Sequence, residues 1–186
     1  MKRIDVNDWK EFTIKDIFKT ETKGKSVQVP TGGQIATKLL SEGGTPRITV
    51  SGVNNGIVGC YSDIDNKNYR IYKNFISVSF LGTVFYQSGR ASLDMKVHCL
   101  KPLDIELTNN TGTFLVTVIR VAIRRFVYQD QLSSTVLPNI TLTLPATASG
   151  DPDWEYMELY MSKVLSESET RLELLESVTR GQEDNR

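Results

Sequence analysis

The chain has 186 residues, of which 39% are hydrophobic and 24% charged, enough for a buried core and too apolar for a disordered tail. Its formal net charge is zero, which by itself argues against a nucleic-acid-binding protein. However, residues 1–150 carry 18 Lys and Arg against 12 Asp and Glu, a net +6, whereas residues 151–186 carry 4 against 10, a net −6. We therefore predict two parts, a basic body over residues 1–150 and an acidic C-terminal segment over residues 151–186.

Cysteine content and the polarity of the N-terminus indicate where the protein works. Cys60 and Cys99 are too few for a disulfide scaffold, which favours a reducing compartment. Residues 1–10 are polar and lack the apolar segment of a signal peptide. The longest apolar stretch, residues 114–127, is interrupted by arginines and is too short to span a bilayer. These features predict a cytoplasmic protein with no membrane contact.

The first 44 residues predict one short helix followed by a loop. Thr13 can cap a helix that reaches Ile17, because Asp16 stands three residues later, as in a capping box. Residues 23–44 are rich in Gly, Ser and Thr, which predicts an extended loop with a short helix near residues 35–40.

The middle of the chain predicts a β-sheet. Short runs of β-branched and aromatic residues are separated by Gly, Asn and Pro. Ile76, Val78 and Phe80 alternate with polar residues and would share one buried face of their strand. Asn54-Asn55-Gly56 is typical of a turn, because Asn and Gly adopt positive φ at low cost. The predicted strands are residues 47–50, 57–61, 75–80, 83–87, 97–100 and 140–144.

Residues 110–126 change to a helical period, with their apolar side chains on one face. Asn110 or Thr111 would cap this helix, and Arg120 and Arg124 would lie one turn apart on its exposed face. Many of these residues are β-branched, so a strand is the alternative. We favour the helix because residues suited to an N-cap stand at its start.

The last segment, after a linker at residues 146–150, predicts one long helix. Asp151-Pro152-Asp153 is a strong helix start, and apolar residues then recur at spacings of three and four up to about residue 178. Such a stripe predicts a partner helix, with packing on its own body as the alternative. The residues assigned to this partner or dimer face are Met157, Tyr160, Met161, Val164, Leu165, Leu172, Leu175 and Val178. The predicted fold is a mixed α/β, β-rich body followed by one long C-terminal α-helix.

The sequence contains no motif that identifies an enzyme. His98 and Cys99 are adjacent and lack the paired spacing of a zinc site, and with one histidine no Ser–His–acid triad is convincing. Glu21-Thr22-Lys23 has the acid-x-Lys form of metal-dependent nucleases without a suitable preceding acid. Neither a glycine-rich cofactor loop nor a methyltransferase tetrapeptide is found. We predict a non-catalytic protein without cofactor or metal, with a nuclease using Glu21 and Lys23 as an alternative.

Polar and basic residues in predicted loops and strand ends together indicate a partner that is either a nucleic acid or another acidic molecule, and composition does not choose between the two. Lysine and arginine contact phosphates, whereas arginine, asparagine and glutamine can read base edges in the major groove. For each such residue taken alone, an ordinary solvated surface is the favoured interpretation. The candidate DNA-binding residues are Lys23, Lys25, Ser51, Asn54, Asn55, Tyr86, Arg90, Arg124, Arg125 and Gln129.

Several segments, taken in order along the chain, resemble a known family. They are Trp9 with Phe12-x-Ile14-x-Asp16-Ile17-Phe18, residues 46–59, Ile76-Ser77-Val78-Ser79-x-x-Gly82, Leu132-Ser133-Ser134-Thr135-x-Leu137, Ile140-Thr141-Leu142-x-Leu144-Pro145 and residues 151–158. The chain is identified from them as similar to the DNA specificity (S) subunit of type I restriction–modification systems and to the related Bcg-type specificity proteins. The resemblance covers nearly the whole chain, and its specificity lies in the ordered set of segments.

The resemblance implies a role for each part of the chain. Residues 1–150 would be a target-recognition domain that reads one half of a bipartite sequence in double-stranded DNA. Residues 151–186 would be the spacer helix that sets the distance between half-sites and docks the modification (methyltransferase) subunits, and through them the restriction subunit. Catalysis and cofactor binding would belong to those partners.

The chain departs from the family pattern because it has one recognition domain and one spacer helix, where a full specificity subunit has two of each. Two copies that associate through antiparallel helices would form a homodimer with true twofold symmetry, which predicts a palindromic bipartite site. The alternative is a truncated orphan or an interaction protein that occupies the specificity-subunit position without reading DNA.

Overall fold

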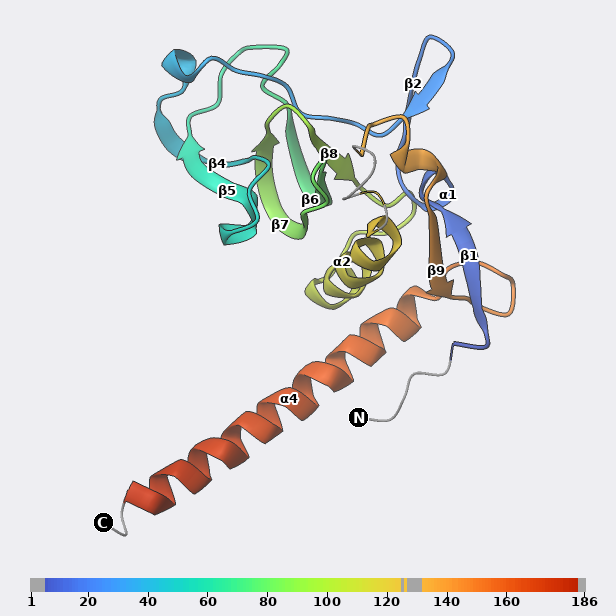
Figure 1. Cartoon of the computed structure of the whole chain (residues 1–186), viewed down its shortest axis with the longest axis vertical. Coiled ribbons are helices and arrows are strands. Elements are labelled where there is room, and N and C mark those ends of the chain that lie inside the picture. Colours follow the sequence, from blue (N-terminus) through green and yellow to red (C-terminus); the bar gives the residue numbers. More distant parts are fainter. Residues whose placement is uncertain (1–5, 125, 127–131, 184–186) are drawn as a thin grey trace.

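Figure 1 shows the computed structural model of the chain, which describes residues 6–124, 126 and 132–183, with side chains described up to residue 177. Within these residues, five strands form one sheet in the order β5-β4-β7-β6-β8. Neighbouring strands are antiparallel except β4 and β7, which are parallel. The strands are β4 (Glu42–Ile48), β5 (Ile57–Tyr61), β6 (Ile71–Ser79), β7 (Val84–Leu93) and β8 (Val97–Leu100).

The other elements cover this sheet or extend from it (Figure 1). Helix α2 packs against β7 and β6, two short antiparallel strand pairs flank the body, and α4 extends away from it. This arrangement confirms the predicted fold class, a mixed α/β body with a long C-terminal helix. The strand pairs are β1 (Trp9–Thr13) with β9 (Thr141–Pro145) and β2 (Glu21–Lys23) with β3 (Ser26–Gln28). The α-helices are α1 (Ile14–Ile17), α2 (Asn109–Ile123) and α4 (Trp154–Glu183). The short 3-10 helices are η1 (Thr37–Leu39), η2 (Asn54–Gly56) and η3 (Leu137–Asn139).

Apolar side chains are buried on both faces of the sheet. Ile76 and Val78 of β6 belong to the main core, which α2, the β1–β9 pair and the start of α4 complete. Phe75 points into a smaller cluster together with Ile48 and Leu93. The sequence pattern predicted one buried face for β6, and the second face is also buried, because side chains of the neighbouring strands β4, β7 and β8 pack together on it. The sheet therefore contributes to apolar packing on both of its faces.

The predicted strands at residues 57–61 and 97–100 are confirmed as β5 and β8. The strand predicted at residues 47–50 is wrong in its bounds, because β4 starts at Glu42 and ends at Ile48. Pairing decides these bounds, since Arg47 lies opposite Gly59 of β5 on one side and Ser92 of β7 on the other. The same long-range pairing makes β6 start earlier than predicted, at Ile71, and β7 end later than predicted, at Leu93. Pairing also creates β1, β2 and β3, which were not predicted.

The helices predicted up to Ile17 and over residues 110–126 are confirmed as α1 and α2, and the short helix predicted near residues 35–40 is the 3-10 helix η1. The Thr13 backbone N–H donates to the Asp16 carboxylate at 2.9 Å, as the capping box predicted. Helix α2 is capped by Thr108 rather than by Asn110 or Thr111. Thr111 instead occupies the third helical position, where its hydroxyl accepts the Thr108 N–H at 2.9 Å.

Arg120 and Arg124 of α2 are both exposed, as predicted, although Arg120 also contacts the sheet. Arg120 Nη2 donates to the Val84 carbonyl at 2.6 Å, and the guanidinium lies 5.5 Å from the centroid of the Phe85 ring. Arg124 is the C-cap residue of α2 and is exposed. The helix comes so close to β7 that a Cβ atom on Gly112 would lie 2.6 Å from the Tyr86 ring.

His98 of β8 is buried in the body rather than placed at a site. Its Nδ1 lies 3.1 Å from the Thr31 hydroxyl, and its Nε2 donates to the Leu132 carbonyl at 3.4 Å. Burial lowers the pKa of this imidazole to about 4, because the charged form loses its hydration. The described residues contain no group of three or more His, Cys, Asp or Glu side chains that could hold a metal ion.

Acidification is expected to destabilise the body through His98. The unfolded imidazole titrates near its ordinary pKa of 6.5, so between pH 6.5 and about 4 the unfolded state binds one more proton than the folded state. The free energy of unfolding therefore decreases as the pH is lowered through this window, by about 2 kcal/mol from pH 7 to pH 5. Three carboxyls have a lowered pKa and all are exposed; they are Asp16, Asp63 and Glu106.

Urea denaturation at pH 7 and pH 5 measures this effect, with His98→Gln as the control. The variant is expected to be less stable overall, since it changes a buried group, but to lose most of the difference in unfolding free energy between the two pH values. An equal pH dependence in the variant and the wild type would assign the effect to other groups.

Helix α4 begins directly after Asp153, as its acidic cap predicted, but it continues beyond the predicted end near residue 178. The Asp153 carboxylate accepts the Tyr156 N–H at 2.8 Å, and the helix runs for 30 residues to Glu183, roughly 45 Å. Pro152 precedes the helix and bridges to Ala146 instead of forming the first turn. In the described part of the chain, no helix is long and apolar enough to cross a membrane.

Candidate nucleic-acid interface

The β2–β3 hairpin presents the two lysines predicted from the sequence. Lys23 ends β2 and its Nζ lies 3.7 Å from the Glu21 carboxylate, with both side chains about half exposed. Lys25 lies in the turn after Gly24, whose φ of +62° is the left-handed conformation that glycine adopts without strain. The Glu21–Lys23 pair considered for a nuclease is thus an exposed ion pair at a hairpin. Lys25 at its turn is open to a phosphate.

The connection from β4 to β5 holds Ser51, Asn54 and Asn55 in a defined shape. Asn54 and Asn55 have φ values of +48° and +51°, as the predicted turn requires. Asn54 Nδ2 donates to the Ile57 carbonyl at 3.2 Å, and the Asn55 carbonyl accepts from Gln87 Nε2 at 2.9 Å. Ser51 Oγ accepts the N–H of the nearby Val53 at 3.3 Å. The Asn55 side chain is exposed, and its backbone is held by the hydrogen bond from Gln87.

Arg90 of β7 is exposed, but its charge is already partly neutralised. Its Nη2 lies 2.6 Å from the Asp63 carboxylate, which also accepts the Thr45 hydroxyl at 2.7 Å. The hydrogen bond from Thr45, followed by that from Arg90, holds the pKa of Asp63 below its usual range. Arg90 would have to exchange this partner to contact a phosphate.

Tyr86 lies between the sheet and α2. Its hydroxyl donates to the Leu107 carbonyl at 3.0 Å, and desolvation raises the pKa of the phenol. This placement gives Tyr86 a packing role in the unbound protein. Arg125 and Gln129 lie outside the described residues.

The structure does not gather the predicted residues into one cluster. The β2–β3 hairpin and the β4–β5 turn lie on different sides of the body, as Figure 1 shows. Lys23 and Lys25 form one group, and Ser51, Asn54 and Asn55 form a second.

A third basic group, missed in the sequence, is brought together by the fold. A hydrogen bond from Lys101, followed by the charges of Lys101, Lys19 and Lys73, holds the pKa of the Glu106 carboxyl below its usual range. Lys101 Nζ lies 2.9 Å from Glu106 and donates to the Lys73 carbonyl at 3.4 Å. Lys73 lies opposite Arg90 in the β6–β7 ladder. No sequence signal could have found this group, because its members come from distant segments.

The residues assigned to the partner face of α4 divide into two sets. Met157 is buried in the main core, and Tyr160, Met161 and Val164 are partly buried against the body. Glu158 ties the helix to the N-terminus of α2 by accepting from Thr108 and, at 2.7 Å, from Asn110. Beyond Val164 the helix leaves the body, and Leu165, Leu172 and Leu175 are 46%, 59% and 64% exposed. The side chain of Val178 lies outside the described residues.

The fold thus combines a body that carries exposed basic loops with one long helix that carries an apolar stripe. Residues 6–177 match the family model described as the type I restriction modification DNA specificity domain. The chain belongs to this family, which confirms the resemblance seen in the sequence. Its members are specificity subunits and are not themselves catalytic.

A curated relative is the specificity subunit S.BcgI of the type II restriction enzyme of Heyndrickxia coagulans, 30% identical over 168 residues, which are 88% of this chain and 46% of the relative. The fold is similar to that of the type I restriction–modification S subunit from M. genitalium, with a TM-score of 0.61, 16% identity and coverage of 95% and 43% of the two chains. The HsdS subunit from Thermoanaerobacter tengcongensis matches with a TM-score of 0.59, 8% identity and coverage of 89% and 39%. The chain spans less than half the length of each of these relatives.

Proposed function

We propose that this chain reads one half of a bipartite DNA sequence and that two copies pair through α4 to read both halves. The observation that carries the proposal is a single recognition body joined to a helix whose apolar stripe is exposed beyond Val164. Exposed leucines on a long helix are stabilised by burial against another helix. A twofold axis across α4 would place two identical bodies at opposite ends, so the site read by the dimer is palindromic and interrupted.

The same helix is proposed to dock the modification (methyltransferase) subunits, and through them the restriction subunit. Catalysis and cofactor binding then belong to those partners, which fits a cytoplasmic, non-catalytic DNA-recognition subunit. Family membership supports this assignment. The second candidate is an orphan that binds the methyltransferase subunits and is indifferent to DNA sequence; the basic group of Lys19, Lys73 and Lys101 favours DNA binding over this alternative.

Gel-shift selection from a pool of randomised DNA tests the proposal, with this chain and type I methyltransferase subunits mixed and separate. We expect enrichment of a palindromic bipartite site by the complex. Binding of the methyltransferase subunits with no enriched sequence would support the orphan. Absence of DNA binding, with and without those subunits, would reject DNA recognition.

Substitutions in the two predicted loops should separate phosphate contacts from base contacts. Lys25→Ala is expected to weaken binding to all DNA sequences and to reduce the salt dependence of log K by about 0.9, the contribution of one phosphate contact. Asn54→Gly keeps the positive φ and removes the amide, so it should relax preference at one base pair by about 1–3 kcal/mol. Fluorescence anisotropy across a salt series measures both effects.

The matched control for Lys25→Ala is Lys163→Ala, which removes the same charge from α4. It should leave the salt dependence and the preferred sequence unchanged. If Lys163→Ala reproduces the effect of Lys25→Ala, the contribution of the hairpin is general electrostatic attraction rather than a phosphate contact.

A further inference from the structure

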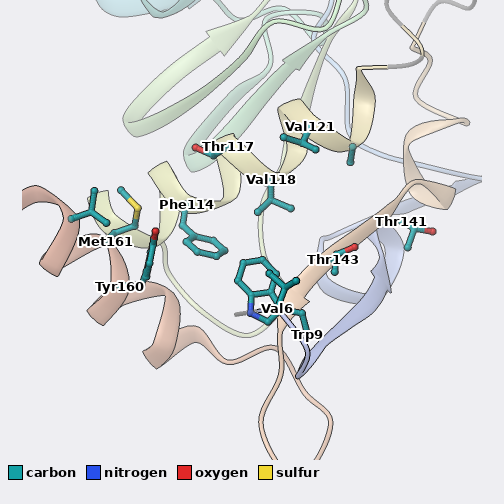
Figure 2. A pocket seen from close by; sticks show the side chains of 12 residues that line it. Val6, Trp9, Phe114, Thr117, Val118, Val121, Thr141, Thr143, Tyr160 and Met161 are labelled. Atoms are coloured by element: carbon teal, nitrogen blue, oxygen red, sulfur yellow. The ribbon is translucent and has the colours of Figure 1, made fainter. Parts of the chain in front are cut away.

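An apolar groove of about 630 Å³ lies between α2, α4 and the β1–β9 pair (Figure 2). Phe114, Val118 and Val121 of α2 form one wall, and Tyr160 and Met161 of α4 lie across from them. None of the described residues that line it is charged, so the groove does not suit a phosphate backbone. We call this site the α2–α4 groove; its lining is Val6, Trp9, Phe114, Thr117, Val118, Val121, Ala122, Thr141, Thr143, Tyr160, Met161 and Val164.

The α2–α4 groove is continuous with the exposed stripe of α4. Met161 and Val164 line the groove, and Leu172 and Leu175 follow on the same helical face after the helix has left the body. One apolar surface therefore starts inside the body and continues along the free part of the helix. Such a surface is covered by a long, apolar, helical partner rather than by a small ligand.

We propose that the α2–α4 groove receives the C-terminal half of α4 from a second copy of this chain, an inference that rests on the helix-mediated dimer proposed above. The chain cannot fill its own groove with this segment, because α4 is one continuous helix from Trp154 to Glu183. Residues 166–177 carry four glutamates and one arginine, a net −3, and they would approach a body with a net charge of +6.

The stripe has the symmetry that this arrangement needs. Met161, Val164, Leu172 and Leu175 lie seven and four residues on either side of Ser168. An antiparallel pair of helices that cross at Ser168 therefore sets Leu172 opposite Val164 and Leu175 opposite Met161, which are residues of the groove wall. Ser168 is small, and its hydroxyl donates to the Val164 carbonyl of its own helix at 2.7 Å, so it permits a close crossing.

This arrangement gives residues of the body a part in holding the dimer. The partner helix would pass Thr117 and Val121 of α2 as well as the stripe of α4, so each body would hold the end of the other helix. Contact with both α2 and α4 fixes the direction of the partner helix better than contact with α4 alone. The groove would thereby fix the angle between the two bodies, and with it the spacing of the half-sites.

Sedimentation equilibrium on the full chain tests the inference through Val121→Glu. Val121 is 62% exposed, so the variant should fold, and a charge in the groove is expected to raise the dimer dissociation constant at least tenfold. The matched control is Val58→Glu on β5, where the valine is 52% exposed and lies outside the groove; it should leave the constant unchanged. Leu172→Glu, measured in the same series, reports only on the contact between the two α4 helices.

The outcomes separate this inference from the proposed dimer. If Leu172→Glu dissociates the dimer and Val121→Glu does not, the groove inference is wrong and the dimer stands. A wild-type chain that is monomeric overturns both. If Val121→Glu weakens binding of methyltransferase subunits and leaves self-association unchanged, the groove belongs to that partner and the inference is wrong.

A positional measurement supports or overturns the inference independently of affinity. In a Cys60→Ser background, which removes the exposed native thiol, a Val121→Cys chain is mixed with a Leu175→Cys chain and treated with a short bis-maleimide. A cross-linked heterodimer is expected. A yield no greater than that of the pair Val58→Cys and Leu175→Cys would overturn the placement of the helix.

Discussion

Replacing Leu172 with glutamate is expected to convert a dimer of this chain to monomers. Leu172 is 59% exposed on the part of α4 that has left the body, so its substitution should not disturb folding. In the proposed dimer it is buried against Val164, and each interface would receive two buried charges. We expect a loss of about 3 kcal/mol or more, a rise in the dissociation constant of at least about a hundredfold. Leu165→Glu should act in the same direction.

Leu174→Glu is the matched control for this experiment. Leu174 is 65% exposed and lies about 120° around the helix from the centre of the stripe, so it should stay largely in water in the dimer. Sedimentation equilibrium measures the dissociation constants, and far-UV circular dichroism verifies that the helix is intact. Equal effects of Leu172→Glu and Leu174→Glu would contradict pairing of the two α4 helices through the apolar stripe. A monomeric wild-type chain would contradict the dimer itself.

Replacing Asp94 with asparagine is expected to destabilise the body by about 3 kcal/mol. Arg47 on β4 is 3% exposed, and its Nη2 lies 2.6 Å from the Asp94 carboxylate and donates to the Gly33 carbonyl at 3.0 Å. The asparagine keeps the shape of the side chain but leaves the Arg47 charge buried without a counter-charge, which is the costly way to break such a pair. The expected loss is at the lower end of the usual range because the Asp94 side chain is 34% exposed.

Asp63→Asn provides the control, because the Arg90–Asp63 pair has the same length of 2.6 Å but lies on the surface. The amide oxygen can still accept the Thr45 hydroxyl, so we expect a loss below about 1 kcal/mol. Urea denaturation of both variants at pH 7 gives the two free energies. Similar losses would show that burial of Arg47 does not determine the strength of its pair.

The sequence predicted the fold well where local chemistry decides. The Thr13 capping box, the positive φ of Asn54 and Asn55 and the start of α4 at Asp153 all follow from residues within one turn of each other. It failed at strand bounds and at β1, because β1 exists through its pairing with β9 near the other end of the body. Such pairing leaves little trace in either segment alone.

The candidate site was predicted less completely than the fold. Polarity correctly placed Lys25 and Asn54 on exposed loops, but it could not show that the Tyr86 hydroxyl is engaged by Leu107 or that Arg90 is paired with Asp63. It also missed the lysines around Glu106, since only the fold brings Lys19, Lys73 and Lys101 together.

The sequence by itself determined the family, the division into a basic body and an acidic helix, and the apolar stripe of that helix, because each is a property of residues close together along the chain. The tertiary structure decided how the stripe is divided. Packing against α2 buries Met157 and leaves Leu172 in water, so the first turns belong to the body and the remainder is open to a partner. Burial depends on neighbours from distant segments, which a pattern along one helix does not specify.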